Sequence, residues 1–72
     1  MDNETTKLLQ LGRKIYAIRR EKGFSQNQLA EKLEISREHL AKIETAKRCV
    51  SLMLLFKISK ILNIPLKEFF YF

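Results

Sequence analysis

Two helix starts lie eleven residues apart in this sequence. Ser25 can accept a hydrogen bond from the first turn of a helix, and Gln28, three residues later, completes a capping-box pattern. Ser36 can cap the next helix in the same way. Only about three residues, Leu33-Glu34-Ile35, lie between these two helices. The spacing predicts a helix-turn-helix over about residues 25–46, a unit that places its second helix in the major groove of DNA.

The residues within this unit follow a more specific pattern. It reads Gln26-x-x-Leu29-Ala30-x-x-Leu33-x-Ile35-Ser36-x-x-x-Leu40-x-x-Ile43-Glu44-x-x-Lys47-Arg48, and it extends outward to Leu11-Gly12, Ile18-Arg19, Gly23 and Leu66-x-x-Phe69-Phe70. The pattern resembles the phage-repressor family of helix-turn-helix domains, called Cro-like or XRE. In length and layout the chain is also similar to the controller proteins of restriction–modification systems. The resemblance implies a compact, all-α, lambda-repressor-like DNA-binding domain of five helices.

Two residues depart from the family pattern. The turn glycine that is usual in the family is Glu34 here, so either the site tolerates a strained backbone or the turn differs. The glycine that usually ends the recognition helix is Ala46, which lacks the freedom that a left-handed cap needs.

Hydrophobic periodicity predicts helices along the whole chain. At about 100° per residue, Leu8, Leu11, Ile15 and Ile18 form one stripe of a first helix, which Gly23 ends. Ser51 can cap a fourth helix that runs to Leu62, and Pro65 suits the start of a short fifth helix. The core-facing residues expected in the second to fourth helices are Leu29, Ala30, Leu33, Leu40, Ile43, Leu52, Leu55, Ile58 and Leu62. No segment alternates with a period of two residues, so we expect five helices and no sheet.

Length and charge limit the domain organisation and the partners. The 72 residues predict a single domain, with a frayed end over residues 1–6 and with residues 51–72 closing the core and mediating dimerisation. The net charge is +6, and the segment from Lys7 to Lys22 holds six basic residues and one acidic residue. Such a charge favours polyanions, and a solvated surface is the alternative interpretation.

The composition also argues against several classes of function. Cys49 is the only cysteine, so neither an intrachain disulfide nor a zinc site is expected, and we expect no metal and no cofactor. No credible pair of groups exists for general acid–base chemistry, so we expect no catalytic residue and no enzyme activity. The acidic N-terminus is unlike a signal peptide, and the longest apolar run, Leu52 to Phe56, is too short to span a membrane. We therefore expect a cytoplasmic protein, and the family resemblance implies a bacterial or phage origin and association with the nucleoid when the protein is bound to DNA.

Two charged residues occupy positions where core residues are expected. Arg19 projects among the apolar residues of the first helix, and Glu44 follows Leu40 by one turn. In the family, the matching positions form a buried ion pair that ties the first helix to the end of the recognition helix. The alternative is that both side chains reach water independently. We expect the pair, because an unpaired charge at either position would be costly.

The recognition helix is expected over about residues 36–45. Leu40 and Ile43 point inward, so the opposite face is available to DNA. Arg37 can donate hydrogen bonds to O6 and N7 of a guanine, and Ala41 can make an apolar contact with a thymine methyl group. Glu38 can accept from a cytosine amino group or can simply favour the helix N-terminus. The residues expected to read bases are Ser36, Arg37, Glu38, His39, Ala41 and Lys42. His39 lies to the side of this face: the matching family position often faces DNA, and a structural or solvated histidine is the alternative interpretation.

Three further residues are expected to contact the DNA backbone. Gln26 opens the helix before the turn, where its side chain and the helix amides can bind a phosphate. Lys47 and Arg48 follow the recognition helix, and a solvated loop is their alternative interpretation. Lys42 can reach either a base or a phosphate.

The C-terminal segment is more apolar than one core requires. Leu54 and Ile61 form a second row on the fourth helix, and the chain ends with Phe69-Phe70-Tyr71-Phe72. Phe69 and Phe70 can partly close the core, and the remaining surplus predicts a self-association surface. The controller proteins that the chain resembles dimerise through this end. The residues expected in a dimer interface are Met53, Leu54, Ile61, Phe69, Tyr71 and Phe72.

The expected function is sequence-specific binding of double-stranded DNA by a transcription regulator that acts as a homodimer on an inverted-repeat operator. The alternative is a protein-interaction module, such as an antitoxin, whose apolar C-terminal end holds a partner protein.

Overall fold

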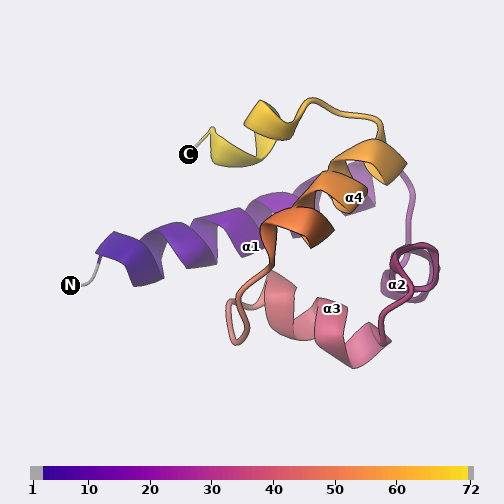
Figure 1. Ribbon diagram of the computed structural model, residues 1–72, viewed down its shortest axis with the longest axis horizontal. Coiled ribbons are helices and arrows are strands. Elements are labelled where there is room, and N and C mark those ends of the chain that lie inside the picture. The colour runs from indigo at the N-terminus through magenta and orange to yellow at the C-terminus, as the bar shows by residue number, and fades with distance from the viewer. Residues whose placement is uncertain (1–2, 72) are drawn as a thin grey trace.

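The computed structural model describes residues 3–71, which form four α-helices, one short 3₁₀-helix and, within that range, no strand (Figure 1). The elements are α1 (Asn3–Glu21), α2 (Gln26–Leu33), α3 (Arg37–Glu44), α4 (Leu52–Leu62) and η1 (Leu66–Phe70). This arrangement confirms the predicted all-α class. The predicted count of five helices requires a correction, because the fifth element is a 3₁₀-helix. Its Glu68 N–H donates to the Pro65 carbonyl, a three-residue spacing typical of such short pieces.

Helix α1 runs along the long axis of the molecule, and it begins earlier than the sequence predicted (Figure 1). A frayed end was expected over residues 1–6, yet residues 3–6 are helical, and residues 1–2 lie outside the described residues. Glu4 lies in the first turn, where a negative charge complements the partial positive charge of the helix N-terminus. This placement favours a helix that extends to Asn3.

The core lies where α1, the helix-turn-helix, α4 and η1 meet. Its buried apolar residues are Ile15, Leu29, Ala30, Leu33, Leu40, Ile43, Leu55, Ile58, Leu62 and Phe69. The prediction that Leu52 belongs to this core is wrong, because 63% of its surface is exposed. At about 100° per residue, Leu52 lies roughly a quarter of a turn from the inward face formed by Leu55, Ile58 and Leu62.

A close backbone approach sets the position of α3. Gly12, in the middle of α1, lies against the C-terminal end of α3, and a Cβ at this position would be 2.6 Å from the Ile43 carbonyl oxygen and 2.8 Å from that of Glu44. Only a residue without a side chain fits between these helices. The glycine therefore fixes how α3, the expected recognition helix, lies on the rest of the domain.

Candidate nucleic-acid interface

Serine caps define the two helices of the helix-turn-helix, as the sequence predicted. The Gln28 N–H donates to Ser25 Oγ at 3.0 Å, and the Ser25 N–H donates to Gln28 Oε1 at 2.9 Å, which completes the capping box. Ser36 Oγ accepts from the His39 N–H at 3.0 Å. This cap fixes where α3 begins, and Arg37 and Glu38 at its start are exposed.

The turn between α2 and α3 resolves the question raised by Glu34. This residue adopts a left-handed conformation, with φ 60° and ψ 38°. Its N–H donates to the Glu31 carbonyl, and the Ile35 N–H reaches the Ala30 carbonyl, a pattern that closes a helix end around a left-handed residue. Ala46 has φ 62° beyond α3. The chain thus takes at both sites a conformation that glycine adopts more easily, so the backbone is strained there rather than rearranged.

The outer face of α3 gathers several of the predicted DNA-contacting residues. Ser36, Arg37, Glu38 and Lys42 are exposed, and Ala41 is half-buried. A shallow hollow on this face is lined by Glu38, Ala41, Lys42, Thr45 and Lys47. The structure therefore brings three predicted base-reading residues next to Lys47, a predicted phosphate contact. Arg48 is also exposed in the loop that follows α3.

His39 is placed apart from this group. It is half-buried and lines a different hollow, between the α2–α3 turn and α4, whose other members include Ile35, Met53 and Leu54. Its side chain is therefore on the α4 side of α3, away from the hollow that holds Ala41 and Lys42. The structure does not group His39 with the other residues that the sequence assigned to base reading.

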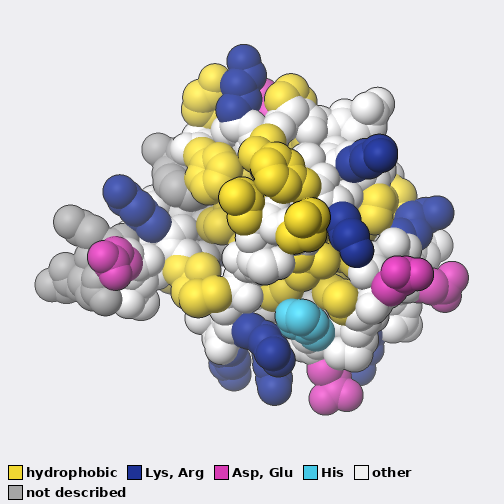
Figure 2. All heavy atoms as spheres, viewed as in Figure 1, with side chains coloured by type: hydrophobic (Ala, Val, Ile, Leu, Met, Phe, Trp, Pro, Cys, Tyr) yellow, Lys and Arg dark blue, Asp and Glu magenta, His cyan; other side chains and the backbone are white. Residues whose placement is uncertain are grey.

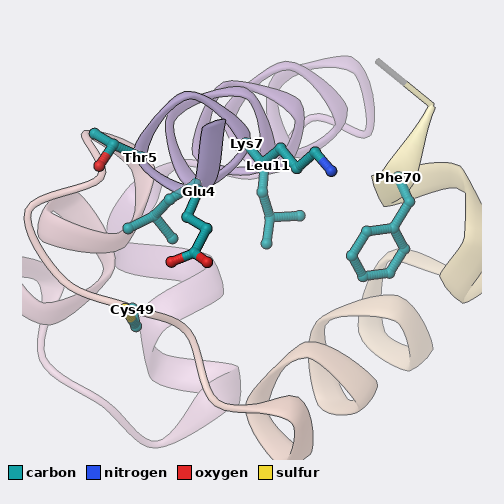
Figure 3. Close-up of a pocket in the computed structure, with 7 residues that line it drawn as sticks. Glu4, Thr5, Lys7, Leu11, Cys49 and Phe70 are labelled. Carbon is teal, nitrogen blue, oxygen red and sulfur yellow. The ribbon is translucent and has the colours of Figure 1, made fainter. Parts of the chain in front are cut away.

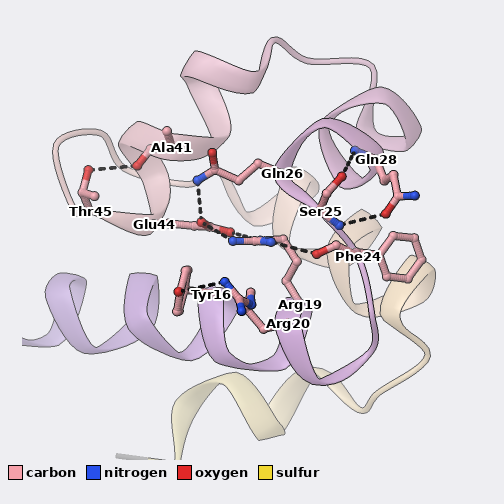
Figure 4. Close-up of polar contacts among 10 residues, drawn as sticks. All are labelled: Tyr16, Arg19, Arg20, Phe24, Ser25, Gln26, Gln28, Ala41, Glu44 and Thr45. Carbon is pink, nitrogen blue, oxygen red and sulfur yellow. Dashed lines mark hydrogen bonds and ion pairs between the residues drawn. The ribbon is translucent and has the colours of Figure 1, made fainter.

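A buried polar network joins the first three helices (Figure 4). Arg19 Nε donates to Glu44 Oε2 at 2.6 Å, and Arg19 Nη2 donates to Glu44 Oε1 at 3.1 Å. The two bonds form a bidentate ion pair. The Arg19 and Glu44 side chains are only 4% and 2% exposed. Arg19 Nη1 also donates to the Phe24 carbonyl at 2.8 Å. Charge-assisted pairs of this geometry combine strength with a fixed orientation. The network therefore locks α1 to the end of α3.

Gln26 belongs to the same network, which the sequence analysis missed. Its Nε2 donates to Glu44 Oε1 at 2.9 Å, although the sequence pointed only to a phosphate contact. No local spacing signals this bond, because the residues are eighteen positions apart. The carboxamide retains a second N–H, and the capping box leaves the first-turn amides of Gln26 and Asn27 without an intrahelical partner. The start of α2 thus keeps donors that can serve an anion.

An exposed apolar surface covers α4 and η1. Hydrophobic side chains gather at the centre of the face shown in Figure 2. The large exposed apolar residues on these elements, together with Tyr71 directly after η1, form what we call the α4–η1 surface: Leu52, Met53, Phe56, Phe70 and Tyr71. Among the residues predicted at a dimer interface, Met53 and Tyr71 are exposed, whereas Leu54 and Ile61 are half-buried against the core.

Phe69 and Phe72 were also predicted at the dimer interface. Phe69 is fully buried, so its assignment to a dimer interface is wrong: η1 turns this ring into the core while Phe70 faces outward. Phe72 lies outside the described residues. The sequence analysis also missed Phe56 as an exposed residue, and because α4 is apolar on several sides, periodicity could not distinguish its outward face.

A pocket lies beside this surface, beneath α1. It is lined by Glu4, Thr5, Lys7, Leu8, Leu11, Cys49 and Phe70, with Cys49 and Phe70 on opposite sides (Figure 3). Within residues 3–71 no group of His, Cys, Asp and Glu side chains is arranged to hold a metal ion. No helix in that range is long and apolar enough to cross a lipid bilayer.

Comparison with known proteins places this geometry in a wider group. The model of the family described as Helix-turn-helix matches residues 15–69. The crystal structure of the restriction–modification controller protein C.AhdI from Aeromonas hydrophila superimposes with a TM-score of 0.85 at 31% sequence identity. The match covers 90% of this chain and 98% of the controller protein. No curated protein sequence matched the chain.

Proposed function

The chain belongs to the XRE-like helix-turn-helix family of DNA-binding transcription regulators, and we propose that it binds an inverted-repeat operator as a homodimer. The observation that carries the proposal is the exposed face of α3, where Glu38, Ala41 and Lys42 share one hollow with Lys47. The similarity of the chain to a restriction–modification controller protein supports a role in the control of transcription. Regulation of this kind needs only placement on DNA and no catalytic residue.

The proposed base contacts come from the start of the recognition helix. Arg37 is exposed in the first turn of α3 and is suited to a guanine, since its guanidinium matches the O6 and N7 acceptors. Ser36, Glu38, Ala41 and Lys42 complete the reading face. Of the residues assigned from sequence, His39 is the weakest candidate, because it lines the hollow beside α4.

The proposed phosphate contacts flank this face. Lys47 and Arg48 are exposed beyond the end of α3, and Gln26 opens α2 with its amide held by Glu44. Contacts of this type fix the register of a protein on the duplex but carry no sequence information. Together they would hold α3 in the groove.

The proposed dimer is built on the α4–η1 surface. A symmetric dimer presents the same patch from both subunits, and exposed apolar side chains on neighbouring elements are suited to such self-association. The same surface supports a second candidate function, in which it holds a different partner protein, as in an antitoxin. The oligomeric state of the protein distinguishes a second copy of the chain from a different partner protein on this surface.

Replacement of Arg37 by alanine tests base reading. After the operator is selected from a random DNA pool, we expect Arg37→Ala to weaken operator binding by about 1–3 kcal/mol and to relax preference at one base pair. Lys47→Ala is the matched control and should weaken operator and random DNA alike, with the salt slope of binding lowered by about one unit. Equal losses of Arg37→Ala on operator and random DNA would reassign Arg37 to a phosphate contact.

A further inference from the structure

A notch lies between the C-terminal half of α1 and the start of α2. One wall carries Tyr16 and Arg20 from α1, and the other carries Ser25, Gln26 and Gln28 from the start of α2. Arg19, Gly23 and Phe24 complete the lining. Figure 4 shows Tyr16 and Arg20 on the side of α1 that faces Gln26 and the end of α3. The notch therefore adjoins the surface that is proposed to face DNA.

The cation in this notch is held in place. Arg20 Nη1 donates to the Tyr16 hydroxyl at 3.3 Å, and the Arg20 guanidinium carbon lies 5.7 Å from the centre of the Tyr16 ring. The same ring lies 5.1 Å from the guanidinium of Arg19, which is buried and fixed by Glu44. A rigid ion pair thus supports Tyr16, and Tyr16 supports Arg20. A side chain that is already oriented loses less conformational entropy when it binds a ligand.

The charges of the notch fit an anion. Arg19 is neutralised by Glu44, whereas Arg20 is exposed and forms no ion pair with any residue in the range 3–71. None of the eight lining residues is acidic. The available groups are hydrogen-bond donors from both walls: the Arg20 guanidinium, the Tyr16 hydroxyl and the Gln26 amide. Guanidinium groups bind phosphate oxygens in a two-pronged geometry.

We propose that this notch binds one backbone phosphate of the DNA duplex through Arg20 and Tyr16. Arg20 supplies the charge, and the Tyr16 hydroxyl, which accepts from Arg20, donates its own proton to a phosphate oxygen. The contact rests on the proposed function and extends it to α1, which then touches the backbone beside the start of α2. The buried ion pair gains a positioning role, because it holds the ring on which Arg20 rests.

The test is the salt dependence of binding to a mixed-sequence DNA duplex. Arg20→Gln should lower the slope of log K against log salt by about one unit, because one counterion-displacing contact is lost. Lys14→Gln is the matched control, since it removes the same charge from the same helix but lies on the other side, beside Tyr71. This control should keep the wild-type slope. Both variants should unfold at the wild-type temperature, because neither residue is part of the core.

Two conservative variants separate charge from geometry. Arg20→Lys should restore the slope but not the full affinity, because an ammonium cannot pair with the phosphate in two-pronged geometry. Tyr16→Phe keeps the ring and removes the hydroxyl, so it should weaken binding at fixed salt without a change of slope. Wild-type binding with an unchanged slope in Arg20→Gln would overturn the notch alone. Failure of the wild type to bind DNA would overturn the proposed function as well.

Discussion

Glu34 and Ala46 hold left-handed backbone conformations at the ends of α2 and α3, with φ 60° and 62°. A residue with a Cβ pays about 1–2 kcal/mol for this conformation, because the Cβ approaches the following carbonyl. Asn63 ends α4 at φ 57°, where asparagine is a common substitute for glycine. The strain at Glu34 and Ala46 therefore lies on either side of α3, in the turn before it and in the loop after it.

Replacement of Glu34 by glycine should stabilise the protein. The relief of backbone strain exceeds the entropy that glycine adds to the unfolded chain, so the free energy of unfolding should rise by about 0.5–1 kcal/mol in urea titrations. Glu31→Gly, three residues earlier inside α2, is the matched control and should lower it by about 1 kcal/mol. A loss of stability in both variants would show that Glu34 is not strained.

The residue scale also shows which features of the site the sequence could predict. Ser25 and Ser36 were identified as caps because the capping pattern is local. The Arg19–Glu44 pairing was expected from two charges on apolar faces together with the family resemblance. The backbone at Glu34 could not be predicted, since the sequence allowed either strain or a different turn. The Gln26–Glu44 bond depends on tertiary packing, which no spacing reports.

At the scale of helices, the contact of α1 with the end of α3 depends on Gly12. A Cβ there would lie 2.6 Å from a backbone carbonyl oxygen of α3, and backbone cannot retreat as a side-chain tip can. Gly12→Ala should therefore lower the free energy of unfolding by about 1–3 kcal/mol, although alanine is the better helix former. Thermal or urea unfolding measures this effect.

The control for Gly12 is the reverse substitution at an exposed site of the same helix. Ala17→Gly should cost about 1 kcal/mol through helix propensity alone. If propensity governed both positions, Gly12→Ala would stabilise the protein, and that outcome would contradict the close approach. A lower affinity for DNA is also expected for Gly12→Ala, because α3 must shift to admit the methyl group.

Helices were easier to predict from the sequence than the faces that they bury. The periodicity of α1 and the caps of α2, α3 and α4 marked the elements well. Helix α4 has apolar residues on several sides, so periodicity assigned Leu52 to the core and missed the exposure of Phe56. In η1 the three-residue winding of a 3₁₀-helix turned Phe69 inward, while the sequence had assigned this residue both to core closure and to the dimer interface.

At the scale of the whole molecule, the reading face and the α4–η1 surface belong to different elements. Figure 1 shows α3 and η1 on opposite sides of α1. Association centred on η1 would therefore leave both copies of α3 accessible, whereas Met53, at the α4 end of the surface, shares a hollow with His39 of α3. A two-fold dimer of this kind would place the two copies of α3 about 34 Å apart, one turn of DNA, and would require an inverted repeat.

Charged substitutions on the α4–η1 surface test the dimer. Met53 is 69% exposed and Phe56 is 47% exposed, so Met53→Glu with Phe56→Glu should leave the fold intact, bury two carboxylates at the interface and give a monomer with much weaker operator binding. Leu54 and Ile61 are poorer choices, because both pack against the core and charges there would also unfold the domain. Met53→Leu with Phe56→Leu is the control and should remain dimeric. Sedimentation at high micromolar concentration measures the oligomeric state, and footprinting on the operator shows how many half-sites are protected. A wild-type protein that stays monomeric and protects a single half-site would rule out the dimer, and a different partner protein would then be the one that binds this surface.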